Sequence, residues 1–383
     1  ASRHPARPRL PLRARHAMSS RSPRLHVDLS RAAGGLPRDV RDELAEALLA
    51  MTEVEFPVGY NFTVVTKSAT LFRAWGGFAN AIDPIVETES DTIYDLASLS
   101  KVVSTTTVAL WLVQSHVWRL KDPVSKWLTD FPRDDLTLAQ LLTHTSGLIP
   151  HRPFFHMGRD PRAIRRAVYA EAATGGPTGD VLYSDLNFML LGWAIERCTH
   201  QPLDRLFHEV VAEPLGMSET RYRPLRRQRG RIAATERNGD QRLTMQLVWG
   251  EVHDGNAWAL GGVAGHAGLF STSDDLTSFV QSLLGARAPR VLSAASISSI
   301  SQTPIGTQSD VRGLGWRLDP AAWGSWPTDT LWHTGFTGTS LLVAPSANLG
   351  VVLLTNAIHP TRQLDRHEEL RASLHSIVAK SLA

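Results

Sequence analysis

The stretch Ser98-Leu99-Ser100-Lys101 opens a long, nearly apolar segment that runs to about residue 117. A hydroxyl and an amine three residues apart lie on the same face of a helix. A serine at a helix N-terminus sits in positive potential and its own N–H can donate to an oxyanion, whereas a lysine in an apolar wall loses proton affinity. The stretch therefore predicts a nucleophile with its base, and the plainer alternative is a capping serine followed by a surface lysine.

A second candidate, Tyr183-Ser184-Asp185, follows a glycine-rich turn at residues 175–179 and precedes an apolar helix. The tyrosine is therefore expected on a loop. A phenol beside an ammonium group can ionise near neutral pH, so Tyr183 is a candidate to take the Ser98 proton and return it to the leaving group. The alternative is a half-buried aromatic residue whose hydroxyl caps the loop.

A third candidate, His333-Thr334-Gly335-Phe336, falls on an expected strand next to Gly338. A polar pair followed by glycine lets a substrate approach the strand edge, and it leaves the Phe336 N–H as a second oxyanion donor. The alternative is a glycine-bearing core strand. Any one of the three motifs can arise by chance, but their order and separation together are much harder to produce.

Periodicity predicts a helical beginning, a hairpin, a helical block, a group of strands and a closing helix. The expected elements are a helix at 38–51, strands at 60–66 and 70–75, helical segments within 99–140, 181–196 and 202–213, strands at 313–318, 331–333, 339–344 and 349–355, and a helix at 366–382. This order indicates an α/β (α+β) fold, in which an antiparallel sheet flanked by N- and C-terminal helices carries an inserted, mostly helical domain. The expected division is a disordered tail at 1–27, an α/β domain formed by 28–97 and 255–383, and the helical domain at 98–254.

Composition excludes several classes of protein. The chain has 383 residues, of which 43% are hydrophobic and 20% charged, so it can bury a large core. Seven arginines precede the first acidic residue, Asp28, and the rest of the chain is net negative, which gives no reason to expect nucleic-acid binding. No run reaches the roughly 18 apolar residues of a membrane helix.

Residues 1–27 are rich in Arg, Pro and Ser and are expected to lie outside the fold, either as an untethered tail or as a targeting leader. The single cysteine, Cys198, cannot form an internal disulfide. Phosphate-loop, zinc-helix and Gly-x-Ser-x-Gly motifs do not occur, so neither a cofactor nor a metal is expected.

Taken together, the three motifs resemble those of the serine β-lactamase and penicillin-binding-protein superfamily, on its class C-like branch of D-Ala-D-Ala carboxypeptidases, family VIII esterases and transacylases. The resemblance covers about residues 38–382 and implies the β-lactamase/transpeptidase-like fold. It implies Ser98 as nucleophile, Lys101 as its partner and Tyr183 as general base and acid, with the N–H groups of Ser98 and Phe336 as oxyanion hole. Further segments that match are 136–148, 213–217 and 265–272.

Two positions depart from the commonest pattern of this superfamily. His333 stands where many members have lysine, and it can orient a substrate carboxylate only when protonated, or else support Tyr183 through a hydrogen bond. Asp185 stands where β-lactamases usually have asparagine. Because an ionised carboxylate cannot donate a hydrogen bond, efficient β-lactam hydrolysis is not expected.

The walls of the cleft are expected from residues 150–157, with Phe154 and Phe155, and on the opposite side from His253, Asp254, Asn256 and Trp258. His144 is expected to organise a turn rather than to catalyse. An alternative role for His253 and His266 is metal ligation, but the sequence around them lacks the carboxylate–histidine spacing that is typical of zinc hydrolases.

The favoured activity is a serine hydrolase that forms a Ser98 acyl-enzyme with a small-molecule ester or amide. One alternative is an acyltransferase that passes the acyl group to an amine or alcohol in natural-product assembly. The other is a non-catalytic binding or sensor protein. A cytoplasmic location is expected, and the oligomeric state is left open.

Overall fold

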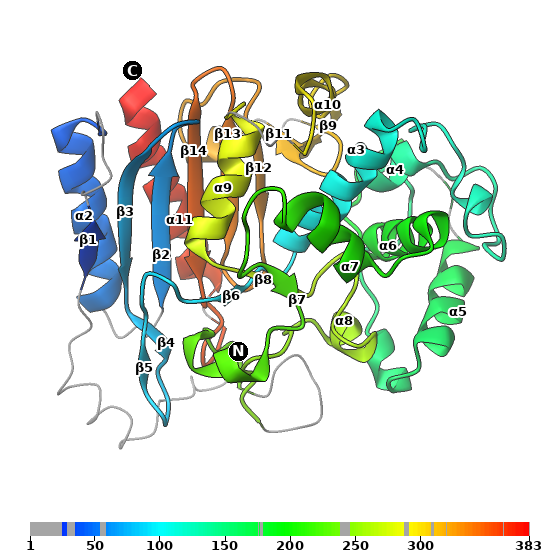
Figure 1. The fold of residues 1–383 in the computed structure, drawn as a ribbon, viewed down its shortest axis with the longest axis horizontal. Helices are drawn as coiled ribbons and strands as arrows, with labels where there is room; N and C mark the ends of the chain where they lie inside the picture. Colours follow the sequence, from blue (N-terminus) through cyan, green and yellow to red (C-terminus); the bar gives the residue numbers. More distant parts are fainter. Residues whose placement is uncertain are drawn as a thin grey trace, which may run out of the picture.

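The computed structural model describes residues 25–28, 35–53, 59–174, 176, 179–237, 246–286, 291–307, 310–318, 320–362 and 364–382. An antiparallel nine-stranded sheet occupies one side of the molecule and helices gather on the other (Figure 1). Its strands run in the order β1-β3-β2-β14-β13-β12-β11-β10-β9. Their bounds are β1 His26–Asp28, β2 Tyr60–Val65, β3 Thr70–Gly76, β9 Ile305–Thr307, β10 Asp310–Arg312, β11 Arg317–Leu318, β12 Leu331–Thr334, β13 Ser340–Ala344 and β14 Leu349–Thr355.

Both faces of the sheet are apolar, and each is covered by helices that bury its side chains. Along β14, Val351 and Leu353 pack into the core beneath helices α2 (Arg38–Glu53) and α11 (Leu364–Ala379). The alternating residues Val352 and Leu354 enter the larger core on the opposite face. Helix α9 (Ser273–Leu283) covers that second face and lies in front of the sheet in Figure 1.

The chain between β6 and α8 is mostly helical. Its elements are a π-helical segment η1 Lys101–Thr106, α3 Thr107–Gln114, η2 Val124–Lys126, α4 Leu138–Leu142, η3 Phe154–Met157, α5 Pro161–Ala172, α6 Asp185–Thr199, α7 Leu203–Phe207, η4 His208–Ala212 and η5 Arg226–Arg231. After it come α8 Gly255–Ala259, α10 Ala294–Ser299, η7 Ala321–Trp323 and η8 Lys380–Leu382. None of the helices in the described ranges is long and apolar enough to span a bilayer.

Two small sheets connect these parts. The strands β4 (Phe78–Asn80) and β5 (Val86–Glu87) pair with each other. The strands β6 (Tyr94–Asp95) and β7 (Arg221–Tyr222) both pair with β8 (Leu269–Ser271). The strands β7 and β8 come from opposite sides of residue 254 in the sequence, yet they pair with each other, and one apolar core contains residues from both segments. The two expected domains therefore pack together as one body at this point.

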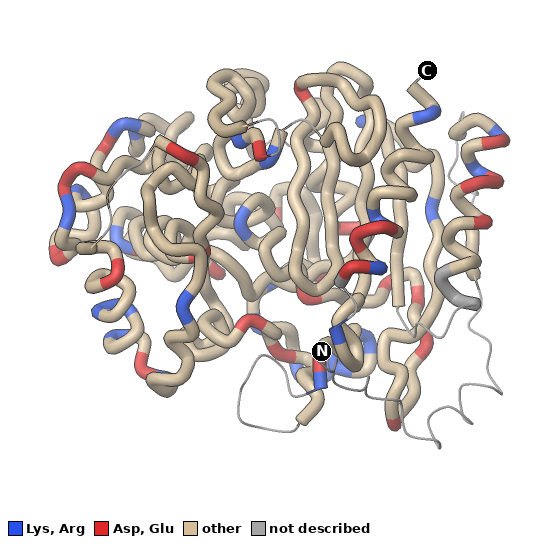
Figure 2. The backbone as a smooth tube through the Cα atoms, turned by 180° about the vertical axis from the view of Figure 1, so that it is seen from behind, with Lys and Arg blue, Asp and Glu red and all other residues tan. Residues whose placement is uncertain are grey.

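Charged residues are interspersed over the backbone. On α2, at the right of Figure 2, basic and acidic residues alternate, as in Arg38, Asp39, Arg41 and Asp42.

Three expectations need correction or fall outside the described residues. His26–Asp28 pairs with β3 as an edge strand, so the fold begins before residue 28, although residues 1–24 lie outside the description. Within the expected strand at 313–318 only Arg317–Leu318 is extended. Gly315 makes a turn there with φ +77°, and a Cβ would meet Thr106 Oγ1 at 2.0 Å. Of the glycine-rich turn, positions 175, 177 and 178 are not described.

Candidate active site

A sharp turn between β6 and η1 presents Ser98. The strand ends at Asp95 and the helical hydrogen bonds begin almost at once, with the Lys101 N–H donating to the Ser98 carbonyl at 3.0 Å. Ala97 adopts φ +46° to make this turn, a conformation that costs a non-glycine residue about 1–2 kcal/mol. Such local strain is retained where surrounding contacts enforce it, and here it places the Ser98 side chain at the helix start, as the motif predicts.

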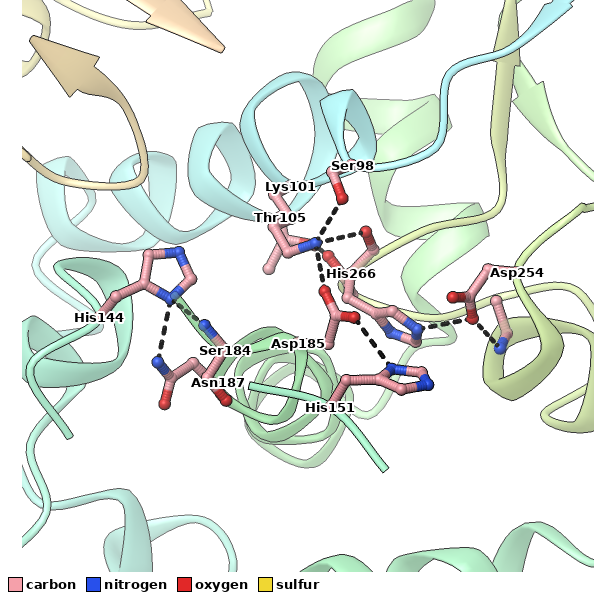
Figure 3. Close-up of polar contacts among 12 residues, drawn as sticks. Ser98, Lys101, Thr105, His144, His151, Ser184, Asp185, Asn187, Asp254 and His266 are labelled. Carbon is pink, nitrogen blue, oxygen red and sulfur yellow. Dashed lines mark hydrogen bonds and ion pairs between the residues drawn. The ribbon is translucent and has the colours of Figure 1, made fainter. Parts of the chain in front are cut away.

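Lys101 joins three groups in the centre of the site. Its Nζ donates to Ser98 Oγ at 2.9 Å and to the His266 carbonyl at 3.1 Å, and it forms an ion pair with Asp185 Oδ1 at 2.7 Å (Figure 3). The Lys101 side chain is fully buried. Three donors directed at three oxygens satisfy the ammonium group completely.

The charge of Lys101 differs from the sequence-based expectation. Burial alone lowers the pKa of Lys101, but the Asp185 carboxylate and then Tyr183 more than offset this, so that the pKa is raised. Burial acts in the opposite direction on Asp185 and raises its pKa. The charge of Lys101 and the hydrogen bond with His151 outweigh this effect, so the pKa of Asp185 is lowered overall. The expectation of a lysine with reduced proton affinity is therefore wrong for the free protein, because the sequence did not reveal that the Asp185 carboxylate pairs directly with Lys101.

Asp185 has a second contact on its outer side. Its Oδ2 lies 3.3 Å from Nδ1 of His151, in the loop that leads to η3. The Asp185 backbone N–H donates to the Pro150 carbonyl at 2.9 Å, which fixes the start of α6 against the same loop. Sequence analysis singled out this loop for its phenylalanines and missed His151.

His266 and His253 each have a carboxylate partner of their own. His266 Nε2 lies 2.9 Å from Asp254 Oδ1, and His253 Nε2 lies 3.0 Å from Glu236 Oε2. Burial raises the pKa of Asp254, and His266 more than reverses this to about 2. Within the described ranges no group of three or more His, Cys, Asp or Glu side chains is placed to hold a metal ion.

His144 organises the loop that carries Tyr183. Its Nδ1 accepts from the Ser184 backbone N–H at 3.1 Å and lies 3.1 Å from Asn187 Nδ2, while its carbonyl accepts from the Leu182 N–H at 2.8 Å. Burial, then nearby positive charges, lowers the pKa of His144 well below its usual range. The structural role expected for this histidine is confirmed, and a consequence is that the Tyr183 ring lies 5.0 Å from Lys101 Nζ.

His333, on β12, lies beside Tyr183 with ring centroids 6.0 Å apart. Its Nδ1 lies 2.9 Å from the Thr334 carbonyl oxygen, so Nδ1 carries the proton and donates. Burial, then Arg312 and Lys101, lowers the pKa of His333 well below its usual range. Its buried Nε2 is therefore a neutral acceptor, and it has no hydrogen-bond partner among the described residues.

The loop after β12 lies directly against the nucleophile turn. A Cβ on Gly335 would meet Thr339 Oγ1 at 2.1 Å and the Leu96 carbonyl oxygen at 2.5 Å, so only glycine allows this approach. The Thr339 hydroxyl donates to the same Leu96 carbonyl at 3.1 Å. This contact places the Phe336 and Ser98 backbones on neighbouring segments, as an oxyanion hole formed by both requires.

Arg312 is a site residue that sequence analysis missed. Its guanidinium lies 5.0 Å from the centre of the Tyr183 ring, and it bonds to both carboxylate oxygens of Asp310. The side chain is almost fully buried, and Nη1 has no hydrogen-bond partner among the described residues. No sequence signal marks this arginine, because only the pairing of β10 with β11 brings it towards β12.

The expected apolar wall is arranged differently. Phe154 is buried in the core of the helical region, 2% exposed, so it supports the loop rather than the surface of a cleft. The large apolar side chains that nearby segments expose are Met157, Leu182 and Phe336. Trp258 is half-buried, donates from Nε1 to Glu251 and lies under Arg159.

Comparisons with known proteins identify the family and the fold. The Beta-lactamase family model matches residues 51–376. A putative D-alanyl-D-alanine carboxypeptidase of Escherichia coli O157:H7 is 30% identical over an alignment of 348 residues, which covers 79% of this chain and 79% of that one. The solved structure of EstCE1, a hydrolase with promiscuous acyltransferase activity, has a TM-score of 0.72 at 20% identity, covering 89% of this chain and 99% of that one. A class C β-lactamase from Rhodobacter sphaeroides has a TM-score of 0.69 at 20% identity, covering 89% and 100%.

Proposed function

Because this chain belongs to the β-lactamase family and is a serine hydrolase or acyltransferase, we propose that Ser98 is its nucleophile and forms an acyl-enzyme with an ester or amide. One observation carries the proposal: the buried Lys101 ammonium donates to Ser98 Oγ at 2.9 Å while Asp185 holds it in place. A fold kept only for binding has no need of a buried cation at a serine that follows a strained turn, and the family assignment replaces the alternative of a non-catalytic sensor.

In acylation, Tyr183 acts in its deprotonated form, as a general base must. Ser98 Oγ bonds to the carbonyl carbon, the carbonyl electron pair moves onto the oxygen, and the Ser98 proton passes to the Tyr183 oxygen. Tyr183 then returns that proton to the leaving alcohol or amine as the tetrahedral intermediate collapses and the bond to the leaving group breaks. Lys101, already protonated, contributes charge rather than acting as the base. His333 Nε2 is the acceptor that supports the Tyr183 hydroxyl. Water then attacks the acyl-enzyme along the same route in reverse.

The oxyanion is stabilised by the N–H groups of Ser98 and Phe336. Among the described residues neither N–H donates a hydrogen bond to the protein. Two free backbone donors near a helix start suit a developing negative charge, and one such donor is worth about 10²–10³-fold in kcat.

The substrate that suits these residues is an ester or amide whose apolar part contacts Phe336, Leu182 and Met157. Neutral His333 cannot orient a substrate carboxylate by charge. Thr334 and Gly335 at the strand edge are the candidates to contact the substrate, and the buried Arg312 guanidinium adds positive charge behind them. Asp185, an acceptor occupied by Lys101, cannot donate to the acylamide group of a β-lactam. Trp258 remains a candidate for the outer wall.

The test compares p-nitrophenyl butyrate with nitrocefin on the same protein. We expect ester turnover with kcat/KM at least about 100-fold above that for the β-lactam, because the lost hydrogen bond, the unpaired acylamide group beside a carboxylate and the poor fit together cost about 3 kcal/mol. Faster hydrolysis of nitrocefin than of the ester would contradict the proposed substrate class.

Acyl transfer is a second candidate, because the similar structure of EstCE1 is described as having promiscuous acyltransferase activity. An amine or alcohol would then replace water as the group that attacks the acyl-enzyme. Added acceptor in millimolar amounts would divert the butyryl group into a new ester or amide, detectable by mass spectrometry. Release of free butyrate alone, at every acceptor concentration, would leave hydrolysis as the activity.

Replacing Tyr183 with phenylalanine is expected to lower kcat for the ester about 10²–10⁴-fold, the range for a general acid–base group. The ring keeps its contacts with His144 and His333 and loses only the hydroxyl. Tyr169→Phe serves as the matched control, since that buried phenol lies at α5. Unchanged burst and steady-state rates in Tyr183→Phe would remove Tyr183 as the base.

Replacing Asp185 with asparagine is expected to shift the alkaline limb of the pH–rate profile to lower pH. The Asp185 carboxylate raises the pKa of Lys101, so without it burial dominates and Lys101 loses its proton at a lower pH. The measurement is kcat/KM for the ester between pH 7 and about 10.5. His151→Gln, which leaves the Asp185 charge in place, should keep the wild-type limb, and an equal shift in both variants would contradict this explanation.

A further inference from the structure

Asp95 is a buried carboxylate next to the site that the mechanism does not use. It is the last residue of β6, three positions before Ser98, and only 2% exposed. Within the described ranges no Lys or Arg side chain forms an ion pair with it. A buried carboxylate without a cationic partner is costly unless its oxygens accept other hydrogen bonds.

The two carboxylate oxygens accept from two different segments. Oδ1 accepts the Ala97 N–H at 2.9 Å, and Oδ2 accepts the His253 N–H at 2.7 Å. The first contact closes the strained turn at Ala97, directly before Ser98. The second fixes the backbone that leads into α8.

The Asp95 main chain reaches a third segment. Its carbonyl accepts from the Thr337 hydroxyl at 2.7 Å, in the loop that contains Phe336. His253, held by Oδ2, stacks on the Phe336 ring with centroids 5.7 Å apart and planes at 20°. Asp95 therefore contacts the turn that carries the Ser98 N–H. It also contacts Thr337 and His253, the two residues that hold the Phe336 loop and ring.

We infer that Asp95 is a positioning residue, which sets the separation of the Ser98 and Phe336 N–H groups by holding Ala97, His253 and Thr337 at once. The expected effect on catalysis rests on the proposed function. The hydrogen bonds that connect Asp95 to the three segments do not depend on it. A shift of about 1 Å in such a group can cost about 10²-fold in rate.

The carboxylate is needed rather than any polar group. Both oxygens accept from backbone N–H donors, so in Asp95→Asn the side-chain NH₂ must face one of those donors. The substitution keeps shape and volume while converting one hydrogen bond into a repulsive contact. The expected result is a fall in kcat for p-nitrophenyl butyrate of about 100-fold, with KM changed less than about threefold.

Asp275→Asn is the matched control. Asp275 is also buried, 7% exposed, and its Oδ2 accepts from the Glu219 N–H at 2.9 Å and the Thr220 hydroxyl at 2.7 Å. It lies on α9, outside the site. Both of these donors reach the same oxygen, so an amide oxygen can replace it, and this control is expected to keep its kcat with little change in melting temperature. An equal loss of kcat in both variants would show that Asp95 is merely structural.

Two further measurements keep the inference open to refutation. Thr337→Val removes only the hydroxyl that donates to Asp95, so kcat should fall about tenfold, and Thr337→Ser, which restores the hydroxyl, should recover it. Amide hydrogen exchange should also rise in Asp95→Asn at residues 96–99 and 335–339 together, and in Asp275→Asn at neither segment.

The exchange measurement needs no turnover, which separates the two possible failures. An inactive wild type would defeat the proposed function, while coupled exchange of the two segments would still support the role of Asp95. Wild-type exchange at 335–339 in Asp95→Asn, or full kcat in that variant, would overturn the inference.

Discussion

Replacing Ser98 with alanine is expected to lower kcat for the activated ester about 10⁴-fold or more, because no acyl-enzyme can form without its oxygen. Stability should hardly change, since Ser98 Oγ accepts one hydrogen bond from Lys101 and the ammonium group keeps its contacts with Asp185 and His266. The measurement is steady-state hydrolysis of p-nitrophenyl butyrate, together with a thermal melt.

Ser100→Ala provides the matched control two residues away. The Ser100 hydroxyl accepts from the Leu269 backbone N–H at 3.0 Å and is buried, so this variant loses a structural hydrogen bond at the same helix start. It should lose about 1–3 kcal/mol of stability and keep its turnover. Retention of more than about a tenth of the activity in Ser98→Ala would place the nucleophile elsewhere.

Replacing Lys101 with methionine is expected to lower kcat about 10³–10⁴-fold and also to destabilise the fold. Methionine fills the volume but leaves the Asp185 carboxylate, 17% exposed, without its cation. Breaking a buried pair from one side costs about 3 kcal/mol. Both effects follow from one ammonium group that acts on Ser98 and is held by Asp185.

The double variant Lys101→Met with Asp185→Asn separates these two effects. With both charges removed, the melting temperature should return most of the way to wild type, because no uncompensated ion remains. The activity should stay low, since Ser98 still lacks the ammonium group. Recovery of activity together with stability would show that Lys101 serves the fold alone.

Local pattern was enough to predict most of the fold. The alternation and turn around 345–348 predict β13 and β14, and the helical spacing at 38–51 predicts α2. The proximity of Ser98 and Lys101 follows from one helical turn. Tyr183 and His333 are candidates from their own local motifs, but they reach Ser98 and Lys101 only through long-range packing.

The remaining features depend on contacts that no local pattern encodes. The pairing of Asp185 with Lys101 reverses the expected charge of the lysine, because it needs α6 and η1 to be packed together. Arg312 reaches Tyr183 only through the β10–β11 turn, where Gly315 avoids Thr106. Phe154 carries the apolar pattern of a cleft residue, but packing places it in the core.

The central claim is tested most directly by intact-protein mass after exposure to a fluorophosphonate probe, in wild type and in Ser98→Ala. The predicted result is a single adduct in wild type, mapped to the peptide that contains Ser98, and none in the folded variant. Equal labelling of Ser98→Ala, or an adduct mapped to another residue of wild type, would contradict the assignment of Ser98 as the nucleophile.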